Sequence, residues 1–315
     1  MLKLTPLILL LFLTIEVRLF ESLQTDKLQA NEPLEIIVTV TDKRGNLIQG
    51  LKQENFQVFI DKIRQKIERV SQADEPISIG IVVDASGSIQ EIARIQDLAK
   101  SISRFQALSN EQNEYFLIAF NDTPELLADW TANLDSGLAN LITVKPRLHT
   151  AFYDACYVAA EKVNSGRHRK RALIVISDGM DNQSRYGFKE VKEYLRETEV
   201  ILNVIGLSTD DGAGGALGKE SRDLLEELSK LSGGVSIFRR DRGSWQSSEL
   251  NKAAEMIAHR LRYQYRIRLT PIYKATEKWH QLKISFNVPH PPKELQGLSA
   301  RAREGFYLPL TKQTK

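Results

Sequence analysis

The sequence predicts an α/β fold: a doubly wound, mostly parallel sheet that is inserted in, or flanked by, a β-sandwich built from N- and C-terminal strands. Two observations support it. The middle of the chain alternates short, unbroken apolar runs with longer stretches of helical period, which is typical of a parallel sheet buried on both faces. The segments before and after it have the composition of strands alone. The 315 residues are enough for about two domains.

Residues 1–25 are interpreted as a signal peptide or an N-terminal anchor. Lys3 precedes an apolar run over 4–15, which ends at Glu16. The run is shorter than the roughly 20 residues that span a bilayer, and it has the length of an export signal. No Ala-x-Ala cleavage site follows, so a buried first strand or helix is the alternative. We therefore expect an extracytoplasmic protein that is secreted, periplasmic or membrane-anchored.

The two end segments are predicted to share one sandwich. Residues 26–75 contain strands at 34–41, 56–60 and 63–70, which are rich in β-branched and aromatic residues, and residues 263–315 contain strands at 263–270, 280–288 and 299–308. Three strands are few for an independent core. A single sandwich made from both ends, with the domain 76–262 inserted between them, solves this problem.

The inserted domain is predicted to alternate strands and helices. The apolar runs predict strands at 77–83, 115–120, 172–176, 200–206 and 235–238. Apolar residues at helical spacing predict helices near 90–108, 152–163, 188–198, 221–231 and 247–261. The only cysteine, Cys156, shares an apolar stripe of the second helix and is expected to pack in the core. A lone cysteine also excludes an intrachain disulfide and a multi-thiolate metal site.

Oxygen-bearing side chains gather where the predicted strands end. Asp84, Ser86 and Ser88 follow the strand 77–83 at a spacing of two, which allows a carboxylate and two hydroxyls to converge. Thr150 precedes the helix 152–163, and Asp178 follows the strand 172–176. In open α/β sheets, ligands bind beyond the carboxyl ends of the strands, so all five should lie on one edge. Hard oxygen donors of this kind suit Mg²⁺ or a similar cation.

This set resembles the metal-ion-dependent adhesion site of von Willebrand factor A domains. The resemblance covers about 76–261 and rests on Asp84-x-Ser86-x-Ser88, Thr150 and Asp178-Gly179 in three different loops. The whole chain resembles, more narrowly, an acidobacterial type of exported, von Willebrand factor A-related bacterial protein. The features of that narrower resemblance are the segments 40–46, 50–56, 150–155, 177–182 and 302–307.

The resemblance implies a non-enzymatic, adhesion-type protein-binding module. Ser86 and Ser88 would ligate Mg²⁺ or Mn²⁺ directly, with Thr150 as a third direct ligand in the high-affinity state. Asp84 and Asp178 would act through coordinated waters. An Asp or Glu carboxylate of a protein partner would complete the coordination.

Other functions and other residues need an interpretation as well. A hydrolase could use His149 as a base for Ser86, but Gly-x-Ser-x-Gly is absent, and a structural module with an unused metal site is a further alternative. A net charge of +3 argues against a dedicated nucleic-acid binder. The basic run 166–171 is interpreted as a solvated loop, with a site for an anionic partner as the alternative. A last group is interpreted as turn and cap residues that could also line the metal-site edge: Asn121, Asp122, Asp181 and Asn182.

Overall fold

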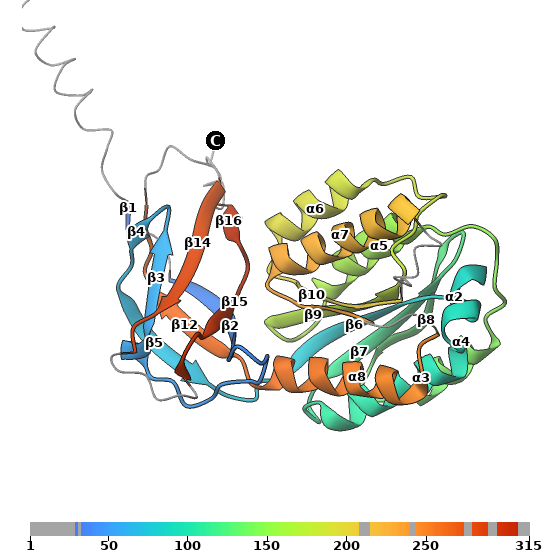
Figure 1. The fold of residues 1–315 in the computed structure, drawn as a ribbon, viewed down its shortest axis with the longest axis horizontal. Helices are drawn as coiled ribbons and strands as arrows, with labels where there is room; N and C mark the ends of the chain where they lie inside the picture. The colour runs from blue at the N-terminus through green and yellow to red at the C-terminus, as the bar shows by residue number, and fades with distance from the viewer. Residues whose placement is uncertain are drawn as a thin grey trace, which may run out of the picture.

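The protein consists of an α/β domain and a β-sandwich, which are joined by the long helix α8 (Ser247–Arg262) (Figure 1). The computed structural model describes residues 29–30, 33–207, 215–239, 244–273, 279–288 and 295–307. The apolar run that we interpret as a signal or anchor lies outside these described residues. In the part of the chain that is described, no helix is both long and apolar enough to cross a membrane.

A six-stranded sheet with the order β11-β10-β9-β6-β7-β8 forms the centre of the α/β domain. Its pairings are parallel except for β8, which runs antiparallel to β7. All residues of β6, β7 and β10 are buried, which explains their unbroken apolar runs. The mostly parallel α/β fold is therefore confirmed. The strands are β6 (Ile77–Asp84), β7 (Glu114–Phe120), β8 (Pro124–Thr131), β9 (Lys170–Ser177), β10 (Ile201–Gly206) and β11 (Ser236–Phe238).

Helices cover both faces of this sheet (Figure 1). One face carries α3 (Ile95–Leu108), α4 (Asp135–Thr143) and α8, and the other carries α5 (Phe152–Val163), α6 (Phe188–Glu197) and α7 (Gly215–Ser232). Alternate strand residues point to opposite faces and so divide the apolar core into two layers. Cys156 of α5 is fully buried in the layer between this helix and the sheet, as predicted.

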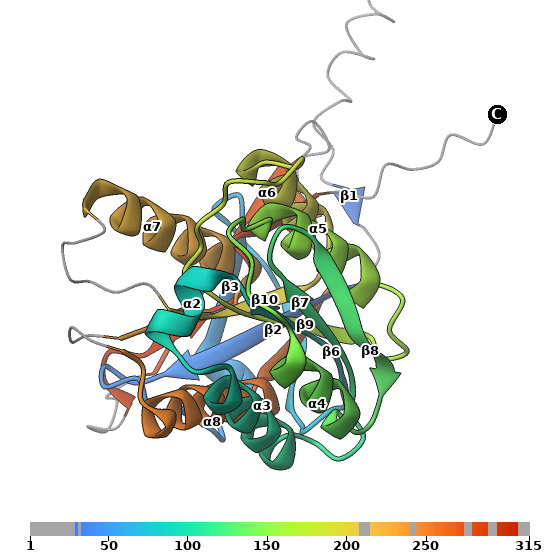
Figure 2. The ribbon, with the colours of Figure 1, turned by 90° about the vertical axis from the view of Figure 1, so that its right-hand side faces the viewer.

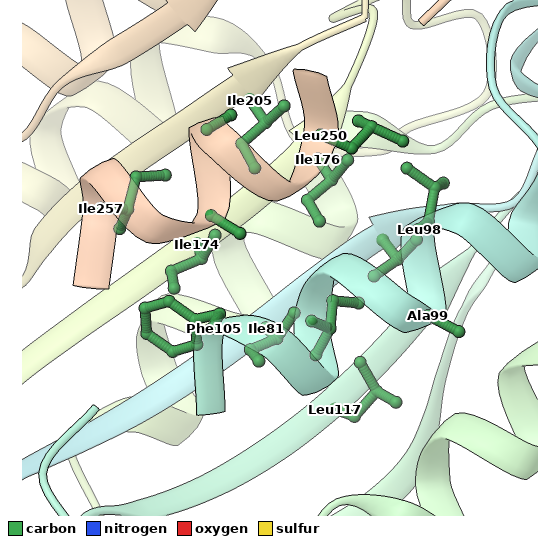
Figure 3. Close-up of a cluster of buried hydrophobic side chains, with 14 of the residues drawn as sticks. Ile81, Leu98, Ala99, Phe105, Leu117, Ile174, Ile176, Ile205, Leu250 and Ile257 are labelled. Atoms are coloured by element: carbon green, nitrogen blue, oxygen red, sulfur yellow. The ribbon is translucent and has the colours of Figure 1, made fainter. Parts of the chain in front are cut away.

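The layer beneath α3 and α8 is built from apolar side chains of the strands and the helices. Ile81 of β6 and Ile174 of β9 lie against Phe105 of α3 and Ile257 of α8 (Figure 3). All four are at most 3% exposed. Burying a side chain of this size stabilises the fold by about 1.5–3 kcal/mol. This layer fixes α8 against the sheet, and α8 continues into the first C-terminal strand of the sandwich.

Strands from the two ends of the chain pair with each other in both sheets of the sandwich. The sheet orders are β15-β2-β12-β5 and β16-β14-β3-β4, and every pairing is antiparallel. Tyr265 lies opposite Val38 in one sheet, and Leu282 lies opposite Ile60 in the other. The predicted sandwich built from N- and C-terminal strands is thus present. Its strands are β2 (Leu34–Thr41), β3 (Phe56–Ile60), β4 (Ile63–Arg64), β5 (Ile67–Gln72), β12 (Tyr265–Leu269), β14 (Trp279–Phe286), β15 (Ser299–Arg301) and β16 (Gly305–Tyr307).

Several predicted elements differ from the observed ones. The predicted helix 90–108 is two helices, α2 (Gly87–Ile92) and α3, because the backbone is extended at Ala93 and Arg94. The predicted strands 63–70 and 299–308 are each broken into two. Both β8 and α4 were missed. Short additional elements are β1 (Gln29–Ala30), its partner β13 (Ile272–Tyr273) and the 3-10 turn η1 (Gln53–Asn55).

Candidate metal centre

The loop that follows β6 is held in place by the backbone of neighbouring loops. The amide of Ala85 donates to the Phe120 carbonyl at 2.8 Å, and the amide of Gly87 donates to the Arg147 carbonyl at 3.0 Å. The amide of Ser86 donates to Oδ1 of Asp84 at 3.0 Å. The loop then enters α2, at the end of the domain that faces away from the sandwich (Figures 1 and 2). The predicted site therefore lies at the carboxyl edge of the sheet.

Four of the five predicted site residues are connected at this edge. The hydroxyls of Ser86 and Ser88 are 3.2 Å apart, and the Ser88 hydroxyl donates to Oδ2 of Asp178 at 3.2 Å. Asp84 joins the cluster through the Ser86 amide and accepts a hydrogen bond from the Ser177 hydroxyl at 2.7 Å. Two loops that are about ninety residues apart in the sequence thus bring two carboxylates and two hydroxyls together.

Thr150, the fifth predicted residue, is fixed through its backbone. Its amide donates to Oδ1 of Asn182 at 2.8 Å, and its carbonyl accepts from the Asn182 amide at 3.0 Å. The residue is 5% exposed and lies beside the loop that carries Asp178. Among the described residues, no hydrogen bond links the Thr150 hydroxyl to the other four side chains.

The two carboxylates are buried, and the described residues offer neither of them an ion-pair partner. Asp84 is 0% exposed and Asp178 is 4% exposed. Burial, and then the nearby Asp178, raise the pKa of Asp84 to about 7, and burial also raises the pKa of Asp178. In the part of the chain that is described, no Lys, Arg or His forms an ion pair with either. Ionised carboxylates in such surroundings are unfavourable unless a cation or several donors offset them.

The donor types at this edge fit a hard cation. Carboxylate and hydroxyl oxygens are the ligands that Mg²⁺ takes, usually with retained waters, whereas zinc sites depend on Cys and His. Among the described residues, no group of three or more His, Cys, Asp or Glu is placed to hold a metal ion, so a centre here would need the serine hydroxyls as well as the two carboxylates. The buried, uncompensated carboxylates and the neighbouring hydroxyls would therefore suit one divalent ion of the magnesium type.

Residues around the site support its loops. Asp122 forms an ion pair with Arg147 at 2.8 Å, Asp181 accepts from the Ser184 hydroxyl at 2.5 Å, and the Asn121 side chain donates to the Lys145 carbonyl. These contacts agree with their interpretation as turn residues. Sequence reasoning missed the positioning residue Ser177, although a hydroxyl directly before Asp178 at the end of a buried strand was a usable signal. It also missed that Asn182 holds Thr150.

Solved structures with a similar course of the chain include two bacterial proteins. One is an aerotolerance-related membrane protein from Bacteroides fragilis, which shares 20% sequence identity with this chain. The match covers 59% of this chain and 98% of that protein, with a TM-score of 0.47. The other is the vWF domain of the type V pili tip protein Mfa5 from Porphyromonas gingivalis, with 13% identity, 59% and 96% covered, and a TM-score of 0.44. No curated protein matches the chain.

The family model of the von Willebrand factor type A domain matches residues 79–180. This range begins in β6 and ends just after Asp178, so it includes all five predicted site residues. The narrower resemblance to an exported bacterial subfamily stays a prediction. The α/β domain therefore matches the von Willebrand factor type A domain over residues 79–180, a segment that includes the candidate metal centre.

Proposed function

We propose that the α/β domain is a non-enzymatic, metal-ion-dependent protein-binding module. Asp84, Ser86, Ser88, Thr150 and Asp178 would hold one Mg²⁺ or Mn²⁺ ion, and an Asp or Glu of a protein partner would complete its coordination. When bound, the cation would supply an electrophilic site for that carboxylate.

The observation that carries this proposal is the convergence of two buried carboxylates and two hydroxyls with no basic partner among the described residues. Asp84 and Asp178 come from different strands, so a structural turn would not require both of them at one point. Burial raises the pKa of both carboxyls, and the charge of Asp178 raises that of Asp84 further, so the described residues do not offset the ionised forms. A divalent cation would provide it, because an opposite charge favours the ionised form.

The residues beside the centre suit a protein partner. Leu148 is 91% exposed and precedes Thr150 by two residues, and Met180 is 44% exposed two residues after Asp178. Exposed apolar side chains of this size are common in the contact surfaces of proteins. A partner with an acidic residue next to apolar residues would use both features. The net charge of +3 gives no reason to propose a nucleic acid.

No arrangement for catalysis supports the hydrolase alternative. A serine nucleophile needs a base within hydrogen-bond reach. The Ser86 hydroxyl instead lies 3.2 Å from that of Ser88, and no hydrogen bond joins it to His149 among the described residues. We also propose an extracytoplasmic location, which rests on the apolar run 4–15 as an export signal or anchor.

Calorimetric titration with MgCl₂ and MnCl₂ tests the metal site. Ser86→Ala should weaken binding at least about tenfold, since even a hydrogen bond to a charged group is worth roughly 1.5–3 kcal/mol. Ser136→Ala is the matched control, because Ser136 is exposed in α4, away from the site. Unchanged affinity in the Ser86 variant would contradict the assignment.

The protein-binding role needs a second experiment. The full chain is immobilised and exposed to extracts of its native organism with Mg²⁺ or with EDTA. A partner retained only with Mg²⁺, and lost in Ser86→Ala but not in Ser136→Ala, is the expected result. If the same partner is retained with EDTA as with Mg²⁺, and by Ser86→Ala as by the wild type, the proposed role of the metal in binding is contradicted.

A further inference from the structure

A cavity lies between the two domains, at the end of the sheet opposite the candidate metal centre. It has a volume of about 40 Å³. The α/β domain lines it with the start of β9, the turn between α6 and β10, and the end of α7, and the sandwich lines it with β2, β12 and the segment between β15 and β16. Figure 1 shows this end of the sheet facing the sandwich. A cavity needs a volume of about 10–15 Å³ to hold one water, so this cavity has room for a small ion or a few waters.

Basic side chains outnumber acidic ones in the lining. Five of the lining residues are cationic and two are acidic. One acid, Glu35, is shared by Arg169 at 3.1 Å and Arg266 at 2.5 Å, and Arg266 also pairs with Glu75. The other acid, Glu199, is exposed. The remaining cations are Lys170, Arg171 and Arg303, and none of the three forms an ion pair with a carboxylate among the described residues.

Two of these three cations are held by backbone carbonyls. The ammonium of Lys170 donates to the Leu261 carbonyl at 2.5 Å, and Lys170 is only 7% exposed. The guanidinium of Arg303 donates to the carbonyls of Gly305 at 2.6 Å and Arg196 at 3.0 Å. These contacts orient both side chains. Neither cation forms an ion pair with a carboxylate among the described residues, although the more distant Glu199 favours the charged form of Arg303 and Glu75 that of Lys170. The interpretation of 166–171 as a solvated loop is therefore wrong for Lys170, because packing of the sandwich and α8 covers it.

Arg171 and Thr198 are the unsatisfied groups of this cavity. Nε of Arg171 is buried and finds no hydrogen-bond partner within the described segments, and the same holds for the hydroxyl of Thr198. No contact in the described part of the chain pairs the Arg171 guanidinium with an acceptor. Buried polar groups in native proteins nearly always have a partner, so two orphaned donors on one cavity indicate an occupant that accepts hydrogen bonds.

We propose that this cavity binds a small tetrahedral oxyanion through the guanidinium of Arg171, the hydroxyl of Thr198 and the charge of Arg303. Water could accept from the two donors but would not neutralise the cations. An oxyanion does both, because its oxygens accept from a planar guanidinium in the way that phosphate does. The small volume restricts the ligand to a phosphate or sulfate group rather than a nucleotide.

The proposed anion would contact both domains at once. Arg171 and Thr198 belong to the α/β domain, whereas Arg303 belongs to the C-terminal segment of the sandwich. The two parts already meet closely here, since the Glu304 amide donates to the Leu231 carbonyl at 3.1 Å. Bound anion would therefore stabilise the junction between the domains, independently of any metal at Asp84.

Titration of the full chain with inorganic phosphate in EDTA tests this site, by calorimetry and by phosphorus NMR. Saturable binding is expected, and Arg171→Gln should weaken it at least about tenfold, because hydrogen bonds to charged groups are worth that much or more. Arg167→Gln is the matched control: it removes the same charge from the same basic run, but its side chain is 62% exposed and lies outside the cavity. Its affinity should stay within about twofold of the wild-type value.

A second variant and two further ligands complete the test of the anion site. Thr198→Val removes the hydroxyl at nearly constant volume and should also weaken phosphate binding several-fold. This variant tests the site even if Arg171→Gln does not fold. Sulfate should compete with phosphate, and glycerol 3-phosphate distinguishes a site for the free ion from one that accepts a phosphate ester. Ser86→Ala should bind phosphate normally. No saturable binding, or equal affinity in the wild type, Arg171→Gln and Thr198→Val, would overturn the proposal.

Discussion

The buried Lys170 should make the stability of the protein depend on pH in the alkaline range. The residue is the first of β9, and its ammonium contacts the last turn of α8. Burial lowers its pKa from 10.5 to about 8. In the unfolded chain a lysine titrates near its ordinary value, so between about pH 8 and 10.5 the unfolded state binds more protons than the folded state. The free energy of unfolding must therefore rise with pH in this window.

The magnitude follows from the two pKa values. Their difference corresponds to about 3 kcal/mol of unfolding free energy, gained as the pH rises from 8 to 10.5. Below pH 8 the lysine is protonated in both states, and the full cost of its buried charge is present. The neutral amine still has N–H groups that can donate to the Leu261 carbonyl, so the main difference between the two states is the buried charge.

Urea unfolding between pH 7.5 and 10.5, in buffer without phosphate, measures this effect. Relative to Lys170→Met, the wild type should gain up to about 3 kcal/mol across the range, since methionine carries no proton to lose. Lys100→Met is the control, because the Lys100 side chain is 71% exposed. Parallel pH profiles for the wild type and Lys170→Met would refute the reasoning.

Three further predictions concern the junction, the core and the sandwich. Gly233→Ala should lower the free energy of unfolding in urea by about 1–3 kcal/mol, because φ is +83° and an added Cβ would lie 2.6 Å from backbone atoms of the sandwich. Gly50→Ala is the control: its φ is +76° but no atom lies within 4 Å of an added Cβ, so it should cost only about 1 kcal/mol. Equal costs for the two variants would contradict the close approach at Gly233. Cys156 should react with a thiol reagent only after unfolding, since burial raises its pKa far above the ordinary value; fast reaction in the native state would contradict this. Deletion of 263–315 should expose 34–41 to proteases while the α/β domain stays folded, because the neighbours of β2 are β12 and β15; continued protection of 34–41 would show independent folding.

The elements that sequence reasoning found are those whose pattern follows from burial on both faces. β6, β7 and β10 are continuous apolar runs because helices cover each side of the sheet. The edge strand β8 was missed because its exposure is mixed and its sequence includes Pro124 and Asp129. The break between α2 and α3 was missed because residues on both sides of Arg94 continue the helical period.

The proximity of four candidate site residues could be predicted because they follow strand ends, whereas their binding of a metal stays a prediction. Asp84, Ser86, Ser88 and Asp178 are brought together by the order of parallel strands, which the sequence pattern indicates. The interdomain cavity was not predictable in the same way. Whether Arg171 is solvated or enclosed depends on how the sandwich packs against the start of β9, and no local periodicity carries that information.

A crystal structure of the full chain grown with MnCl₂ tests the metal site most directly, because anomalous scattering identifies the ion without reference to function. The proposed function predicts one strong anomalous peak at the loop after β6, within about 2–2.5 Å of the Ser86 and Ser88 hydroxyls, as hard cations require. Asp84 and Asp178 should lie around it, and Thr150 should lie at or near ligand distance. A peak at another place, or no peak at this loop at saturating Mn²⁺, would contradict the central claim.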